Sequence, residues 1–132
     1  MRIVFLTFLF CSVYAESWSV VYCAKGITLH KNELRNIYLK RLRTKQGVNI
    51  IALNLPYAHT ARKAFMSQVL HVSEWEWSSY YDEMHFMGIK PPQVLRSEQA
   101  VTHFVKKVEV AVGYIPTALI SDDYIEIARF EP

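Results

Sequence analysis

The residues best suited to chemistry lie in one short stretch, positions 54–65, which reads NLPYAHTARKAF. After its proline come a histidine and a threonine, and the sequence then takes on helical spacing. The first turn of a helix presents unpaired amides and a partial positive charge, so it can hold a carboxylate or a phosphate. Thr60 could add a hydroxyl, Arg62 a bidentate charge and His59 a titratable donor. We therefore predict that Tyr57, His59, Thr60 and Arg62 form a site for a small anion, either phosphate or carboxylate.

The same turn also has a purely structural interpretation. His59 or Thr60 would then cap the start of the helix, and Arg62 would lie on its solvated face. The sequence leaves both interpretations open.

A basic cluster lies around the end of the preceding helical segment and consists of Lys40, Arg41, Arg43 and Lys45. Cations there complement the negative end of a helix dipole, which accounts for them as solvated structural residues. The alternative is that the cluster docks to an acidic protein partner or to anionic head groups of the cell envelope.

Large apolar side chains are concentrated at positions 75–87. One helical face can bury only part of them, so the others would be left outside as a protein-binding patch. We predict a partner-docking surface made of Lys40, Arg41, Arg43 and Trp75; the alternative for the aromatic residues is a place in the core. The apolar set comprises Trp75, Trp77, Tyr80, Tyr81, Met84, Phe86 and Met87.

The sequence does not indicate an enzyme. It has no Gly-x-Ser-x-Gly elbow, no His-Glu-x-x-His zinc motif and no glycine-rich phosphate loop. The histidines lack the spacing of metal ligands, so no metal and no cofactor is expected. Cys23 is expected to be a small core residue rather than a reactive thiol. The acidic residues of one helical segment have the pattern of surface charges, not of an acid–base pair; they are Glu74, Glu76, Asp82 and Glu83.

Strands alternate with helices along the chain, which predicts an α/β fold with helices packed on a mixed sheet. Strands are expected at 18–23, 48–53, 110–115 and 124–130. Helices are expected at 30–42, 60–70, 74–84 and 100–108, with Gln46-Gly47 ending the first. Ser73 and Glu76 have the form of a capping box, and Val72 and Trp77 are placed to close a hydrophobic staple.

The N-terminus has the pattern of an export signal. Residues 1–15 contain one basic residue, a short apolar run and a small residue at the expected cut, so we expect a signal peptide cleaved after Ala15. The apolar run is about half the roughly 20 residues that a membrane anchor needs. We therefore expect residues 16–132 to form a single domain in the periplasm that does not span the membrane.

The charge of the chain argues against nucleic acid as a partner. The formal net charge of +3 comes from 15 basic and 12 acidic side chains. Cleavage would remove Arg2 and leave 14 against 12, a net +2. This excess is too small for a nucleic-acid footprint.

Four motifs occur in the order seen in a known family. ELRNIYLKR, NLPYAHTARKAF, YYDEMHFMGIKPP and AVGYIP follow one another within residues 27–116. This ordered set resembles the short relatives of phosphate-type periplasmic substrate-binding proteins. The resemblance implies a single lobe like half of a type 2 periplasmic binding protein, a class whose full-length members clamp a ligand between two lobes.

The side chains of the turn depart from the family pattern. In the family, the turn supplies an Arg, an Asp and a Ser-Gly-Thr run that hold the oxyanion. Here Leu55 stands at the Arg position, Tyr57 at the Asp position, and His59, Thr60 and Ala61 along the run. The resemblance therefore implies a degenerate anion-binding turn.

Together these features predict an exported, non-enzymatic, substrate-binding-protein-like domain of the phosphate ABC transporter type, with weak or altered ligand binding. The alternative is a periplasmic interaction module that has lost ligand binding and assembles with a cell-envelope complex through a protein partner. An uncharacterised hydrolase is a third class, without a motif to support it.

Overall fold

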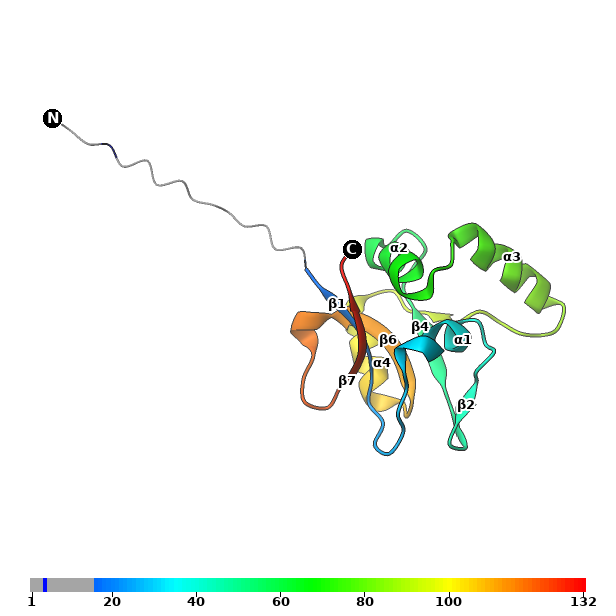
Figure 1. Cartoon of the computed structure of the whole chain (residues 1–132), viewed down its shortest axis with the longest axis horizontal. Coiled ribbons are helices and arrows are strands. Elements are labelled where there is room, and N and C mark those ends of the chain that lie inside the picture. The colour runs from blue at the N-terminus through cyan, green and yellow to red at the C-terminus, as the bar shows by residue number, and fades with distance from the viewer. Residues whose placement is uncertain (1–3, 5–15) are drawn as a thin grey trace.

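The computed structural model describes residue 4 and residues 16–132 (Figure 1). The expected signal peptide and its cut after Ala15 lie outside the described residues, apart from Val4. Among the residues described, no helix is both long and apolar enough to cross a membrane.

The described chain contains strands and helices in the order that the sequence predicts, but the single strand expected at 48–53 is wrong, because residues 48–49 and 51–54 form two strands that belong to different sheets. The strands are β1 (Trp18–Tyr22), β2 (Thr44–Lys45), β3 (Val48–Asn49), β4 (Ile51–Asn54), β5 (Gln93–Val94), β6 (Ala111–Pro116) and β7 (Ile125–Phe130). The helices are α1 (Leu34–Tyr38), α2 (Thr60–Phe65), α3 (Glu74–His85) and α4 (Glu98–Lys107). Short helical turns add η1 (Lys31–Glu33), η2 (Met66–Leu70), which continues α2, and η3 (Thr117–Leu119).

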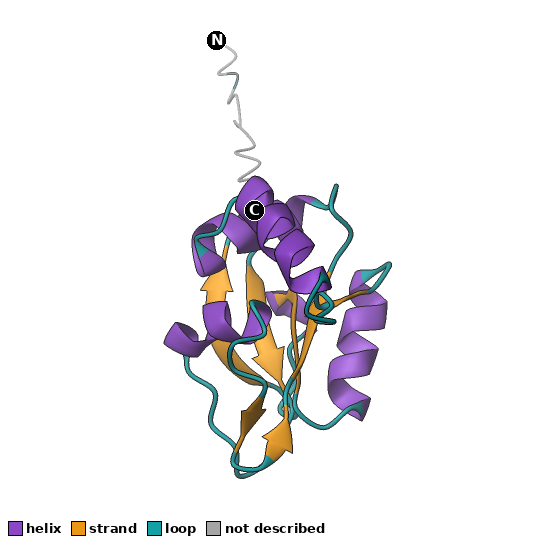
Figure 2. Cartoon of the chain, turned by 90° about the vertical axis from the view of Figure 1, so that its right-hand side faces the viewer, coloured by secondary structure: helices purple, strands orange, loops and turns teal. Residues whose placement is uncertain are grey.

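Five strands form one mixed sheet in the order β5-β4-β6-β1-β7. β4 pairs in parallel with both β5 and β6, whereas β1 runs antiparallel to β6 and β7. Figure 2 shows the strands with helices on both sides. The prediction of an α/β fold with helices on a mixed sheet is confirmed.

Adjacent residues of β6 show how the two layers of helices are held. An added Cβ at Gly113 would lie 2.7 Å from Val101 Cγ1 and 3.3 Å from Val105 Cγ2, because α4 packs directly on this strand. The next side chain, Tyr114, points to the other face and stacks on Phe65 of α2, with ring centroids 4.3 Å apart. β6 is buried along its whole length, so it is the central strand of the core.

The first predicted helix is shorter than the sequence indicates. The expectation of a helix over 30–42 that ends at Gln46-Gly47 is wrong: η1 and α1 cover only residues 31–38. Lys40 takes a left-handed conformation with φ 59° and turns the chain out of the helix. Gln46 and Gly47, with φ 52° and 79°, instead form the tight turn between β2 and β3. Positive φ at both central residues is what a two-residue hairpin of type I′ requires.

The start of α3 agrees with the sequence. The Ser73 side chain accepts a hydrogen bond from the Glu76 amide at 3.1 Å, as an N-cap does. Val72 and Trp77 are both buried, as expected of a hydrophobic staple. The second predicted helix is confirmed as well, since α2 and η2 together span residues 60–70.

Candidate ligand-binding turn

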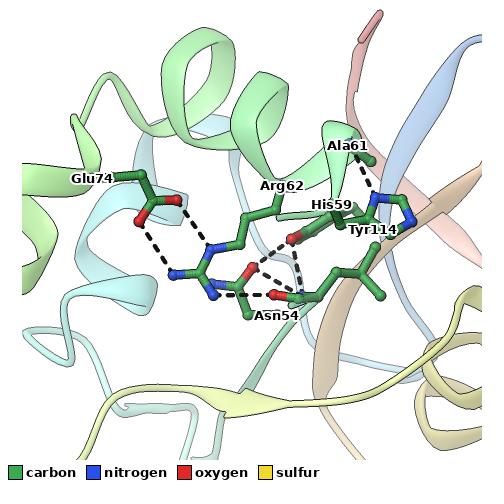
Figure 3. Close-up of polar contacts among 7 residues, drawn as sticks. Asn54, His59, Ala61, Arg62, Glu74 and Tyr114 are labelled. Atoms are coloured by element: carbon green, nitrogen blue, oxygen red, sulfur yellow. Dashed lines mark hydrogen bonds and ion pairs between the residues drawn. The ribbon is translucent and has the colours of Figure 1, made fainter. Parts of the chain in front are cut away.

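The predicted turn connects the end of β4, which lies between β5 and β6 in the sheet, to the start of α2 (Figure 3). Asn54 fixes its first residues: its Oδ1 accepts hydrogen bonds from the Leu55 amide at 3.0 Å and from the Tyr114 hydroxyl. The Tyr114 oxygen also accepts from the Leu55 amide at 3.1 Å. Burial raises the pKa of Tyr114, so its hydroxyl stays protonated and remains a donor. These hydrogen bonds fix the first residues of the turn to the end of β4 and to β6.

His59 is the N-cap of α2. Its Nδ1 accepts a hydrogen bond from the Ala61 amide at 3.1 Å. Its Nε2 lies 3.7 Å from Glu98 Oε1, at the start of α4. The edge of the ring packs on Trp18, with centroids 5.6 Å apart. The capping interpretation of His59 is therefore confirmed.

The first turn of α2 keeps some capacity for a ligand. Thr60 is exposed. The Ala61 amide is bonded to His59 and the Lys63 amide to the His59 carbonyl, whereas the amides of Thr60 and Arg62 have no partner within residues 16–132. Two amides and one hydroxyl are thus available beside this helix terminus.

A hollow of about 360 Å³ lies beside this first turn. Two carboxylates, from Glu16 and Glu98, are among its lining residues. Their negative charge opposes the partial positive charge of the helix terminus, so the hollow is poorly suited to binding an anion tightly. The full lining consists of Glu16, Trp18, His59, Thr60, Glu98 and Pro132.

Arg62 is buried, with only 6% of its surface exposed. Its Nε lies 3.1 Å from Glu74 Oε1 and its Nη2 lies 3.3 Å from Glu74 Oε2. The third nitrogen, Nη1, donates to the Leu55 carbonyl at 3.0 Å. The aromatic rings of Tyr57 and Trp77 lie 5.8 and 6.0 Å from the guanidinium carbon. The alternative that placed Arg62 on a solvated face is wrong, because α3 brings an acidic residue against it.

The four predicted ligand residues do not converge. His59 and Thr60 line the hollow, whereas the Arg62 side chain points toward α3 (Figure 3). Tyr57 is 62% exposed and contacts Arg62. Sequence reasoning missed Glu74 as the partner of Arg62, because no local pattern connects residues 12 positions apart in different helices.

The predicted docking residues lie just after the end of α1 and at the start of α3. Arg41 lies over the Tyr80 ring, 5.5 Å from its centroid, and Arg43 Nε donates to the Lys40 carbonyl at 2.9 Å. Burial and the nearby Arg43 charge lower the pKa of Lys40. Trp75 is 78% exposed.

The apolar set on α3 is divided between core and surface. Trp77 and Tyr81 are buried, whereas Phe86 and Met87 are exposed in addition to Trp75. Lys45, the remaining member of the basic cluster, pairs with Glu33 at 2.6 Å. Among residues 16–132, no group of three His, Cys, Asp or Glu side chains is placed to hold a metal ion.

Comparison with known proteins identifies solved structures with a similar fold. No protein-family model and no curated protein matches the chain. Among solved structures, an ABC-type phosphate transport receptor from Vibrio cholerae matches with a TM-score of 0.55 and 15% sequence identity, over 85% of this chain and 45% of the receptor. The chain has the fold of about half of a phosphate transport receptor.

A second solved structure supports the same conclusion. It is a protein from Clostridium perfringens, assigned as a phosphate ABC transporter substrate-binding protein and solved with bound phosphate. It matches with a TM-score of 0.64 and 14% identity, over 87% of this chain and 46% of that protein. The structural resemblance predicted from the ordered motifs is confirmed. The chain spans less than half the length of either structure.

Proposed function

We propose that this chain is an exported, periplasmic binding domain of the phosphate ABC transporter type that holds small anions weakly and performs no catalysis. The observation that supports the proposal is that the Arg62 side chain is already paired within the protein. Its guanidinium is already bound to Glu74 and to the Leu55 carbonyl, so it is not available to an external anion. The remaining anion-binding groups are two amides and the Thr60 hydroxyl.

The physical terms at the first turn favour weak binding. A helix terminus contributes about half a unit of positive charge, and its effect falls off within one turn. Here the carboxylates of Glu16 and Glu98 line the same hollow and counter that charge. The hollow is also open to solvent, which screens each contact. We infer a dissociation constant for phosphate on the order of 1 mM or weaker, which corresponds to roughly 4 kcal/mol.

The proposal is tested by titrating phosphate, sulfate and acetate into ¹⁵N-labelled protein and recording amide chemical shifts. Saturable shifts are expected at the amides of Thr60 and Arg62, because these lack partners in the described structure. The replacement Thr60→Ala is expected to weaken binding about threefold through the loss of one hydrogen bond. Thr28→Ala, at another exposed threonine, serves as the matched control.

Two outcomes would contradict this assignment. One is the absence of any saturable shift near α2 at tens of millimolar anion. The other is a set of shifts centred elsewhere, for example around Lys25, Lys106 and Lys107, which line a larger surface hollow.

A second function is favoured by a different observation, the exposure of α3. Trp75 is 78% exposed and Phe86 is 91% exposed, and large apolar side chains of this kind are common at protein interfaces. Figure 1 shows that α3 stands at one end of the molecule. On this proposal the chain is a periplasmic interaction module that assembles with a cell-envelope protein through α3 and the basic residues Lys40, Arg41 and Arg43.

If α3 is the docking surface, pull-down from an envelope fraction should recover a stoichiometric partner. Trp75→Ser should then reduce recovery by at least tenfold, since buried tryptophans are frequent hot spots. Charge reversal at Lys40 and Arg43 should reduce it as well. Ile125→Ser, which removes a half-exposed apolar side chain from β7, is the control and should leave recovery unchanged. Equal recovery with Trp75→Ser and wild-type protein would exclude this surface.

A further inference from the structure

The contact between Arg62 and Glu74 has the geometry of a bound ligand. Both carboxylate oxygens face the guanidinium, one at 3.1 Å from Nε and the other at 3.3 Å from Nη2. This is the paired arrangement in which arginine recognises carboxylates and phosphates. In Figure 3, Glu74 approaches Arg62 from the side opposite to His59. The oxyanion position on Arg62 is therefore filled by a residue of the same chain.

The guanidinium is held in place by groups other than Glu74. Nη1 donates to the Leu55 carbonyl at 3.0 Å, and that carbonyl belongs to the turn fixed by Asn54 and Tyr114. The rings of Tyr57 and Trp77 both lie within about 6 Å of the guanidinium carbon, a distance at which an aromatic ring attracts a cation. The guanidinium therefore keeps one hydrogen bond and two aromatic contacts when the carboxylate is removed.

The two partners differ in their access to solvent. The Arg62 side chain is 8% exposed, whereas the Glu74 side chain is 21% exposed. Glu74 is also the first residue of α3, directly after the N-cap Ser73. Removal of its side chain would therefore connect a fixed, buried guanidinium to solvent through a space shaped by a carboxylate.

We propose that Glu74 is an internal ligand that closes a preformed oxyanion site on Arg62, and that this site accepts a small carboxylate or phosphate when the Glu74 carboxylate is absent or displaced. The site consists of Arg62, with Tyr57 and Trp77 flanking the guanidinium. It uses the side chain of Arg62 and not the amides of the first turn of α2, so its test is independent of the anion binding proposed at those amides. An ion pair with a purely structural role behaves differently, because an arginine released from such a pair is free to turn toward solvent.

The test uses the full chain with Glu74→Ala and follows thermal unfolding by tryptophan fluorescence. Sodium acetate or formate is compared with sodium chloride at equal ionic strength. Saturating acetate is expected to raise the melting temperature of the variant by about 4 °C, the shift for a ligand at roughly ten times its dissociation constant. Phosphate is expected to act in the same way. Wild-type protein should show at most the small acetate effect of the first turn of α2, because its own carboxylate fills the site on Arg62.

Three further variants make the test specific. Glu76→Ala removes an exposed carboxylate from the same turn of α3 and should respond to acetate no more than wild-type protein does. The double variant Arg62→Met with Glu74→Ala should lose the response, since the guanidinium is gone. Thr60→Ala in the Glu74→Ala background should keep the response, which separates this site from the first turn of α2. An acetate shift of the same size that persists without the Arg62 side chain, or the absence of this shift from Glu74→Ala, would overturn the proposal.

If Glu74→Ala is unfolded in chloride, the same proposal is tested by measuring whether acetate refolds the variant. Acetate is then expected to recover native tryptophan fluorescence, whereas chloride at equal ionic strength is not. A variant that remains unfolded equally in both salts would also overturn the proposal.

Discussion

Replacing Arg62 by methionine is expected to lower the free energy of unfolding by about 3–4 kcal/mol, because it leaves a largely buried carboxylate without its partner. Arg62 contacts Glu74 through two nitrogens and the Leu55 carbonyl through the third, so all three interactions are lost together. Urea denaturation followed by tryptophan fluorescence measures the change. Lys63→Met, at the next and exposed position of α2, is the matched control and should cost less than about 0.5 kcal/mol.

The cost should fall when both partners are replaced. Arg62→Met combined with Glu74→Met removes the unpaired charge and substitutes apolar side chains of similar length, which is often close to neutral for a buried ion pair. The double variant is therefore expected to be more stable than Arg62→Met alone. If the two replacements simply added, or if Arg62→Met cost as little as Lys63→Met, the pair would have no role in holding α3 against the turn.

Replacing Phe65 by alanine is expected to be at least as damaging, at about 3–5 kcal/mol. Phe65 is fully buried at the end of α2. Its ring stacks on Tyr114 at 4.3 Å and meets Tyr38 edge-on at 4.8 Å, so a cavity would open between the helices and β6. Both tyrosines also donate hydrogen bonds to the core, Tyr114 to Asn54 and Tyr38 to the Leu53 carbonyl at 2.7 Å.

Chemical denaturation of Phe65→Ala and Phe86→Ala makes a matched comparison. Phe86 is 91% exposed at the end of α3, so its truncation should cost less than about 0.5 kcal/mol. A similar cost for the two variants would mean that the aromatic cluster beneath α2 is not the centre of the core.

The sequence predicted those parts of the fold that local patterns determine. Ser73 begins α3 because its side chain and the Glu76 amide are three positions apart, a spacing that can be recognised without knowledge of the fold. The strand-proline-helix form of residues 54–65 was also recognisable, and with it the place of the candidate site. The ordered motifs also led to the correct fold.

The errors arose where no local pattern was decisive. Lys40 ends the first helical segment in a left-handed conformation. The sequence does not predict this conformation, because glycine is the residue that usually adopts it. β5, with only Gln93 and Val94, is too short to show alternation.

The most consequential omission was the pairing of Arg62 with Glu74. Burial of Arg62 depends on how α3 packs against α2, and this packing is a tertiary contact rather than a sequence pattern. The same holds for Glu98, which approaches His59 from α4. The sequence therefore located the turn but did not reveal that its charged residues are already paired or capping.

The central proposal is that this turn binds phosphate only weakly because its side chains serve the structure. Isothermal titration calorimetry of the wild-type chain with phosphate near neutral pH tests it most directly. The account predicts no saturation at 100-micromolar levels and a dissociation constant on the order of 1 mM or weaker. A dissociation constant of about 10 micromolar or tighter would contradict it, since the free groups of the first turn cannot supply that affinity while Arg62 is bound to Glu74.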